Sequence, residues 1–202
     1  MLTSNGYRLD ESRVGPLEPV PDAIRDDRDA LWHRLRRDGY LFLRGALDPE
    51  RVWAFRRHTR PGENGVGTAT QAHYDLVYLR EGTDRVLSAW IPLGDCPTSL
   101  GGLTYLQGSH HRVLAEEQAG GVRRTGWITA DLPRLAERYD TRWLVTDYAA
   151  GDLVVHSYLI HAALDNVDPI GTMRLSTDIR YQRSDLPIDW RWQHDWHDHD
   201  GP

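Results

Sequence analysis

Residues 86–106, VLSAWIPLGDCPTSLGGLTYL, carry the clearest fold signal in this sequence. Val86 to Leu93 is a short apolar run that predicts a strand, and Leu103 to Leu106 predicts another. Gly94 to Gly102 lies between them and has the glycine and proline content of a loop. Short strands that alternate with turns in this way favour a mainly β fold.

The segments on both sides of this stretch predict helices first and further strands later. Asp27 to Arg37 has a partly amphipathic helical pattern that Gly39 ends, and Asp48-Pro49-Glu50 is a typical start for a second helix that reaches His58. Further strands are expected at 40–43, 70–79, 151–159 and 172–181, with a loop at 61–67 and partly helical structure in 112–142. This order predicts a double-stranded β-helix, or jelly roll, with helices packed outside.

The composition limits the domain count and excludes several kinds of chemistry. With 202 residues, 40% of them hydrophobic, we expect a single domain over residues 1–202. A net charge of -6 argues against nucleic acid as a partner. All 24 basic residues are arginine, so no lysine can form a Schiff base. Cys96 is the single cysteine, so any metal must be held by histidine and carboxylate side chains.

No stretch of the sequence predicts export or insertion into a membrane. Met1 to Asp10 lacks the cationic start and apolar run of a secretory signal, and no apolar stretch is long enough to span a bilayer. We therefore expect a cytoplasmic protein without a membrane partner, and the absence of lysine suggests a GC-rich bacterial genome. The sequence leaves the oligomeric state open.

The triplet His73-Tyr74-Asp75 falls within the strand expected at 70–79. Residues two apart on a strand point to the same face, so both side chains could reach one ion. His161 follows an apolar strand late in the chain and could supply a third ligand. Two histidines and one carboxylate form the facial triad that holds non-haem Fe(II) and leaves positions open for a co-substrate and O2. Because a lone His-x-Asp also arises by chance, an ordinary hydrogen-bonded strand histidine is the alternative for His73.

A second signal follows thirteen residues after His161, where Arg174-Leu175-Ser176 begins the next expected strand. The guanidinium of Arg174 and the hydroxyl of Ser176 would share one face of that strand. Together they could bind a carboxylate through charge-assisted hydrogen bonds. A buried arginine without such an anion would be costly.

These motifs stand in an order that resembles the phytanoyl-CoA dioxygenase family of iron and 2-oxoglutarate oxygenases. The similar blocks cover most of the chain: 38–45 (DGYLFLRG), 71–75 (QAHYD), 90–93 (WIPL), 101–103 (GGL), 108–110 (GSH), 151–155 (GDLVV), 161–166 and 174–181. The resemblance implies that His73, Asp75 and His161 bind the iron and that Arg174 binds the far carboxylate of 2-oxoglutarate. It further implies that Trp90 lines the co-substrate pocket and that Ser176 assists the arginine.

The sequence departs from the family pattern at two places. Gln107 stands where a proline usually precedes Gly-Ser-His, which affects the shape of that loop. The interval between the second helix and His73 is also shorter than the family leads us to expect. Either a segment that covers the substrate is missing from this interval, or the active site is unusually open.

Other histidines and the C-terminal segment have more ordinary interpretations. His156 could compete with His161 as the distal ligand, but it interrupts an apolar strand and better fits the core or a place beside the ligands. His110 and His111 are expected in a loop near the cleft. The aromatic and acidic segment 190–200 fits no metal site, and its tryptophans are expected to pack against the barrel or a partner chain.

The function predicted from these residues is that of an Fe(II)- and 2-oxoglutarate-dependent dioxygenase. In this reaction 2-oxoglutarate is converted to succinate and CO2, and O2 supplies oxygen to an aliphatic C–H bond. Asp75 favours oxygenation, because related halogenases leave that ligand position open for chloride. The alternatives are a cupin-like zinc hydrolase or isomerase, which would need a general base, and a non-catalytic jelly-roll binding module. The acidic, lysine-free composition favours a small secondary metabolite over an acyl-CoA as substrate.

Overall fold

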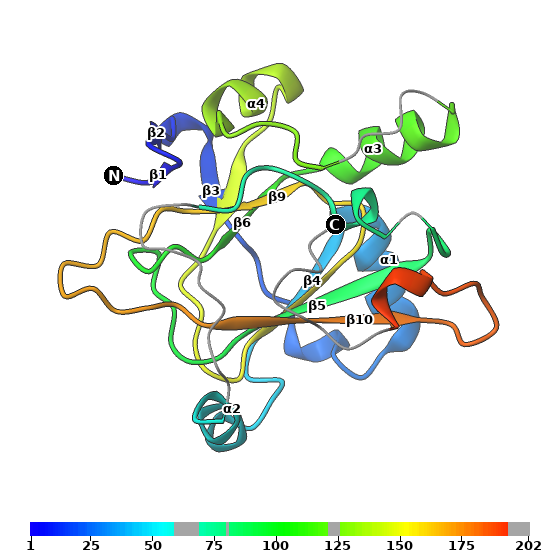
Figure 1. Ribbon diagram of the computed structural model, residues 1–202, viewed down its shortest axis with the longest axis horizontal. Helices are drawn as coiled ribbons and strands as arrows, with labels where there is room; N and C mark the ends of the chain where they lie inside the picture. The colour runs from blue at the N-terminus through cyan, green and yellow to red at the C-terminus, as the bar shows by residue number, and fades with distance from the viewer. Residues whose placement is uncertain (59–68, 80, 121–125, 194–202) are drawn as a thin grey trace.

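The computed structural model describes residues 1–58, 69–79, 81–120 and 126–193. Two four-stranded sheets dominate the structure, one in the order β10-β5-β8-β4 and the other in the order β3-β7-β6-β9 (Figure 1). Only the β3–β7 pair is parallel among the strand pairs of the described residues. The strands are β3 (Val14–Pro16), β4 (Tyr40–Leu43), β5 (Val86–Pro92), β6 (Leu103–Leu106), β7 (Trp143–Val145), β8 (Leu153–His156), β9 (His161–Ala163) and β10 (Ser176–Gln182), with a small hairpin of β1 (Thr3–Ser4) and β2 (Tyr7–Arg8).

The main core lies between the two sheets. The sheet β10-β5-β8-β4 contains the two longest strands and is called the larger sheet, and β3-β7-β6-β9 is called the smaller sheet. The larger sheet contributes Phe42, Trp90 and Val154 to one buried cluster, and the smaller sheet contributes Tyr105 and Leu144. Alternate residues of each strand point to this interior, as the pleat of a strand requires. Two mainly antiparallel sheets packed in this way form the jelly roll that the sequence predicts.

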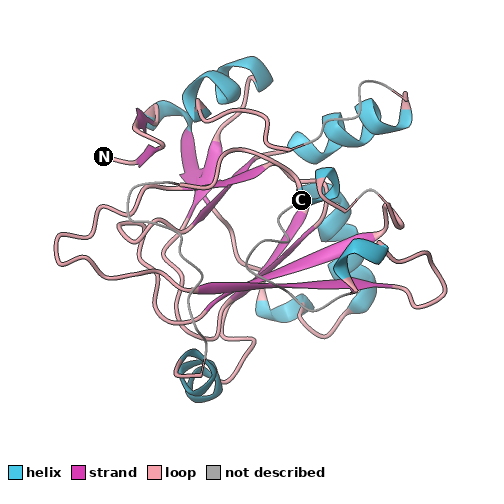
Figure 2. Cartoon of the chain, viewed as in Figure 1, coloured by secondary structure: helices cyan, strands magenta, loops and turns pink. Residues whose placement is uncertain are grey.

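Helices cover the outer faces of the two sheets (Figure 2). Leu35 of α1 (Arg28–Asp38) packs against Leu41 and Val155 on the outside of the larger sheet. Leu135 of α4 (Leu132–Tyr139) packs with Trp143 of the smaller sheet. The remaining helices are α2 (Pro49–Arg56), α3 (Ser109–Gln118) and the short 3-10 helices η1 (Glu11–Arg13), η2 (Asp22–Ile24), η3 (Asp75–Val77) and η4 (Trp190–Trp192). None of the helices that the structure describes combines the length and hydrophobicity needed to cross a bilayer.

The prediction of a strand at residues 70–79 is wrong. Among these residues only Ala72 and His73 form β-bridges, and the chain turns into η3 at Asp75. Tyr74 has extended backbone angles, φ -129° and ψ 144°. One extended residue between His73 and Asp75 is enough to keep their side chains on the same side, so the spacing argument survives although the strand does not.

Two further expectations differ from the structure. His110 and His111 lie in α3, whose first residue is Ser109, and not in a loop. Trp190 is exposed, which differs from packing against the barrel, while its packing against a partner chain stays a prediction. The loop expected at 61–67 and the last part of the aromatic segment lie outside the described residues.

Candidate metal centre

The two histidines of the predicted triad are neighbours across a β-bridge. The amide of His73 donates to the carbonyl of His161 over 3.0 Å, and the amide of His161 donates back over 2.9 Å. His161 is the first residue of β9, directly after the turn that follows β8. The pairing places both imidazoles at one end of the barrel, with ring centroids 4.3 Å apart.

Asp75 completes a compact cluster with these histidines. Its Oδ1 lies 3.8 Å from Nε2 of His73 and 3.6 Å from Nε2 of His161. The candidate ligand atoms of the three residues all lie within 4.8 Å of one another, and the three residues are buried. The structure therefore brings together the three residues predicted from the sequence.

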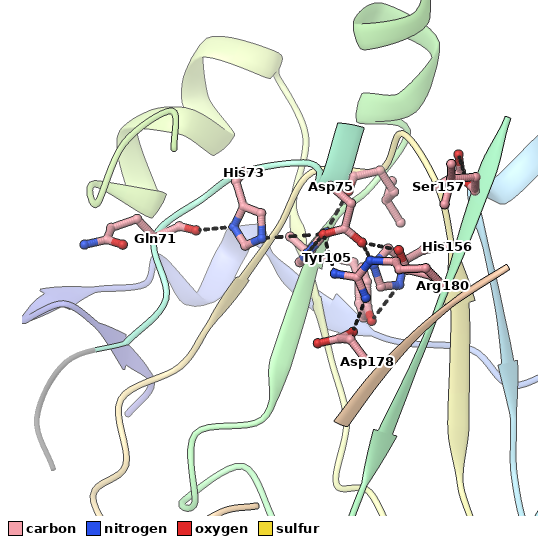
Figure 3. A network of polar contacts seen from close by, with 12 residues as sticks. Gln71, His73, Asp75, Tyr105, His156, Ser157, Asp178 and Arg180 are labelled. Atoms are coloured by element: carbon pink, nitrogen blue, oxygen red, sulfur yellow. Dashed lines mark hydrogen bonds and ion pairs between the residues drawn. The ribbon is translucent and has the colours of Figure 1, made fainter. Parts of the chain in front are cut away.

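Backbone hydrogen bonds orient both imidazoles toward the centre of this cluster. Nδ1 of His73 donates to the carbonyl of Gln71 over 2.8 Å (Figure 3). Nδ1 of His161 donates to the carbonyl of Leu159 over 3.0 Å. A carbonyl can only accept, so Nδ1 carries the proton in both rings and Nε2 keeps its lone pair. Histidines that bind a metal are commonly fixed in this way through their second nitrogen.

The electrostatic surroundings favour the ligand forms of these side chains. Burial raises the pKa of Asp75, but the hydrogen bond from His156 and the charges of His161, His156 and Arg180 together hold it well below the usual carboxyl value. Burial and the neighbouring histidines His73 and His156 lower the pKa of His161 well below that of a free imidazole. A carboxylate and a neutral imidazole are the forms that bind metal.

A second charged pair lies beside the cluster on β10. Nη2 of Arg180 lies 3.6 Å from Oδ1 of Asp75, and Nη1 lies 3.4 Å from Oδ1 of Asp178 (Figure 3). Burial raises the pKa of Asp178, while the charge of Arg180 acts in the opposite direction. The region thus contains two carboxylates and a guanidinium that remains partly exposed.

Arg174 and Ser176 lie together, as their spacing predicts. Nη1 of Arg174 donates to Oγ of Ser176 over 3.0 Å, and its guanidinium carbon lies 5.9 Å from the ring centroid of Trp90. Trp90 is only 1% exposed and belongs to the core between the sheets. Within the described ranges no carboxylate forms an ion pair with Arg174. This half-buried guanidinium is therefore available to an anionic ligand.

Sequence reasoning missed Ser88, whose hydroxyl donates a short hydrogen bond to Oδ2 of Asp75. Ser88 is the one polar side chain in β5, and a polar residue inside an apolar strand is a usable signal. Arg180 and Asp178 also carry a signal, because they continue the two-residue spacing of Arg174 and Ser176 along β10. The sequence shows these residue types and their spacing, but it does not show their distances from Asp75.

An apolar groove of about 680 Å³ lies outside the cluster, between α1, α3 and the ends of β5 and β10. Its lining includes Trp32, Leu35, Leu114 and Tyr181. None of the three candidate ligands lines it among the described residues. We therefore assign metal chemistry to the barrel end and not to this groove.

The donor set fits Fe(II). Two imidazole nitrogens and one carboxylate oxygen on one side of an ion make the facial arrangement typical of non-haem iron sites, which leaves the opposite positions free. Fold and site together define a jelly-roll protein with a two-histidine, one-carboxylate centre.

Comparison with known proteins identifies the family of this chain. Residues 58–170 match the family model described as Phytanoyl-CoA dioxygenase (PhyH), which is more than half of the chain. The chain belongs to this family.

Individual proteins resemble the chain in sequence or in fold. The chain is 31% identical over 191 residues to the 1-deoxypentalenic acid 11-beta-hydroxylase of Streptomyces exfoliatus, covering 86% of this chain and 64% of that protein's length. Among solved structures, the carbocyclase SnoK from nogalamycin biosynthesis has a TM-score of 0.60 at 21% identity, covering 85% of this chain and 89% of SnoK. EvdO2 from Micromonospora carbonacea var. aurantiaca, solved with 2-oxoglutarate, has a TM-score of 0.53 at 16% identity, covering 90% and 100%. At these identities the structural matches establish the shared fold.

Proposed function

We propose that this protein is an Fe(II)- and 2-oxoglutarate-dependent dioxygenase that hydroxylates, or otherwise oxidises, an aliphatic C–H bond of a small organic substrate. The observation that carries the proposal is the cluster of His73, Asp75 and His161 in a member of the phytanoyl-CoA dioxygenase family. The guanidinium of Arg174, which has no carboxylate partner among the described residues, supports 2-oxoglutarate as the co-substrate.

The three ligands and Arg174 have separate roles in this proposal. Nε2 of His73, Nε2 of His161 and Oδ1 of Asp75 hold the metal, and their backbone and side-chain partners keep them aligned without it. Bound Fe(II) supplies the activation of O2 and the oxidative decarboxylation of 2-oxoglutarate to succinate and CO2. Arg174 and Ser176 bind the carboxylate of 2-oxoglutarate farthest from the metal, with Trp90 as a rigid wall beside the guanidinium.

The co-substrate assignment predicts a spectroscopic result. When 2-oxoglutarate is added to the anaerobic, Fe(II)-loaded protein, we expect a visible metal-to-ligand charge-transfer band, because the keto acid chelates the iron. Zinc should suppress the band, since Zn²⁺ generally binds nitrogen and oxygen sites more tightly than Fe²⁺. Absorption spectroscopy in an anaerobic cuvette measures both effects. A folded, iron-loaded protein without the band would favour a binding module or a zinc enzyme.

We further propose a small secondary metabolite as the substrate, and not an acyl-CoA. The support is the 31% identity to a hydroxylase whose named substrate is 1-deoxypentalenic acid, together with the acidic, lysine-free composition. Succinate release should therefore rise with compounds from a panel of small organic acids, and not with acyl-CoA thioesters of similar carbon content. Mass spectrometry of the same reactions identifies the oxidised product. If only the acyl-CoA thioesters increase succinate release, the proposal of a small secondary metabolite as the substrate is wrong.

A further inference from the structure

One row of side chains crosses three strands of the larger sheet beneath Asp75. Ser88 of β5 pairs with Arg180 of β10 on one side and with His156 of β8 on the other. Residues paired across neighbouring strands point to the same face of the sheet, which here is the interior. Figure 3 shows His156 and Arg180 converging on the carboxylate of Asp75.

The two carboxylate oxygens of Asp75 have different contacts. Oδ2 accepts the hydrogen bond from Ser88 and lies 3.2 Å from Nε2 of His156. Oδ1 faces Nε2 of His73 and Nε2 of His161 at 3.8 Å and 3.6 Å, and it also lies 3.6 Å from Nη2 of Arg180. Ser88 and His156 therefore contact only Oδ2, while Oδ1 faces the two candidate histidine ligands.

His156 is arranged as a donor to Oδ2. It is completely buried, and apart from its approach to Asp75 its Nε2 has no hydrogen-bond partner in the described part of the chain. Its Nδ1 lies 3.5 Å from the hydroxyl of Tyr105, which is a long contact. The carboxylate of Asp75 can only accept a hydrogen bond, so the Nε2 that faces Oδ2 carries a proton.

We propose that His156 and Ser88 are positioning residues that hold Asp75 as a one-oxygen ligand through Oδ1. The proposal rests on the metal site of the proposed function. A carboxylate that is free to rotate can bind a metal through both oxygens and so fill a position that the co-substrate or O2 needs. The hydrogen bond from Ser88 and the approach of Nε2 of His156 to Oδ2 oppose that rotation. Partners of this kind typically contribute 10- to 100-fold, as an order of magnitude, to metal affinity.

The test compares two substitutions of His156 by titration with Co²⁺, without co-substrate or turnover. His156→Leu keeps an apolar side chain of moderate size but removes the donor, and we expect Co²⁺ affinity to fall about 10- to 100-fold. His156→Gln places a side-chain N–H near the position of Nε2, and its affinity should stay close to that of the unmodified protein. His110→Leu is the matched control, because His110 is buried but bonds to the carbonyl of Arg36.

The visible spectrum of bound Co²⁺ provides a second readout, since its bands depend on the number and geometry of the ligands. We expect His156→Leu and Ser88→Ala to change the bands, and His110→Leu to leave them unchanged. Because Ser88 and His156 act on the same oxygen, the double variant should lose less affinity than the two single losses combined predict. If His156→Leu does not fold, Ser88→Ala carries the test, and an unchanged spectrum there overturns the proposal.

The outcomes separate this inference from the proposed function. An unmodified protein that does not bind Co²⁺ would refute the metal site itself. If the unmodified protein binds and folded His156→Leu binds equally well with the same spectrum, only the positioning role is refuted. An equal loss of Co²⁺ affinity in His156→Gln and His156→Leu would also refute the positioning role. The loss would then come from altered packing and not from the missing hydrogen-bond donor.

Discussion

Replacing His161 by alanine is expected to abolish metal-dependent turnover of 2-oxoglutarate. The substitution removes one of the three proposed ligands, and its Nε2 lies 3.6 Å from Oδ1 of Asp75 at the centre of the cluster. Residues that only support a ligand contribute 10- to 100-fold to affinity, so loss of a ligand itself should exceed about 100-fold. Fe(II) titration under anaerobic conditions and succinate formation measure the two effects.

The control for this experiment is the same substitution at His156. That residue approaches Oδ2 of Asp75, and not the oxygen that faces the candidate ion. We expect His156→Ala to weaken metal binding without abolishing it. Circular dichroism checks that both variants fold. If His156→Ala loses the metal and His161→Ala retains it, the assignment of the distal ligand is wrong.

Replacing Arg174 by alanine should weaken 2-oxoglutarate binding while leaving Fe(II) binding nearly intact. The guanidinium donates to Ser176 and has no carboxylate partner in the described residues, and it is not among the proposed ligands. Removing one partner of a buried charge pair typically costs roughly 2–5 kcal/mol, or about 30-fold to several-thousand-fold in affinity. Two successive titrations, with metal first and 2-oxoglutarate second, separate these effects.

Two more conservative substitutions test the geometry of the pair formed by Arg174 and Ser176. Ser176→Ala removes only a neutral hydrogen bond, worth about 0.5–1.5 kcal/mol, so it should weaken 2-oxoglutarate less than Arg174→Ala does. Arg174→Lys keeps the charge but loses the planar fork, and its affinity should fall between the two. Unchanged 2-oxoglutarate affinity in folded Arg174→Ala would refute the assignment. Arg180, which also faces the interior near Asp75, would then be the next residue to test.

Helix ends could be predicted because local side chains determine them. The side chain of Asp27 accepts from the amides of Asp29 and Ala30 at the start of α1, and Gly39 ends the helix with φ of 81°. Asp48 caps α2 in the same way, although that helix ends at Arg56, two residues earlier than expected. These interactions lie within a few residues of one another, so the sequence contains all of their determinants.

Three strands of the smaller sheet, β3, β7 and β9, could not be predicted, because they depend on distant partners. β7 and β9 have three residues each, too few for an alternating pattern to be recognised. The turn at Asp75 is similar, since His73 pairs with His161 for a single bridge before the chain bends into η3. Tertiary pairing, and not local propensity, ends the extended segment there.

The candidate ligands could be predicted from the sequence, but the contacts that support them could not. His73, Asp75 and His161 could be selected because their residue types suit a metal and because they stand within sequence blocks whose order resembles the phytanoyl-CoA dioxygenase family. The contacts of Ser88 and His156 with Asp75 depend on strand register, which places residues from separate parts of the chain in one row. A shift of one residue would turn both side chains to the other face, and the sequence does not state the register.

The backbone bridge between His73 and His161 links the metal to folding. The two residues lie far apart in the sequence, and they meet only when the segment before η3 and strand β9 have come together. An unfolded chain cannot hold them in this arrangement, so an ion at the site binds the folded state selectively. By mass action its binding free energy then adds to the stability of the fold, and the ion acts as a reversible cross-link across one end of the barrel.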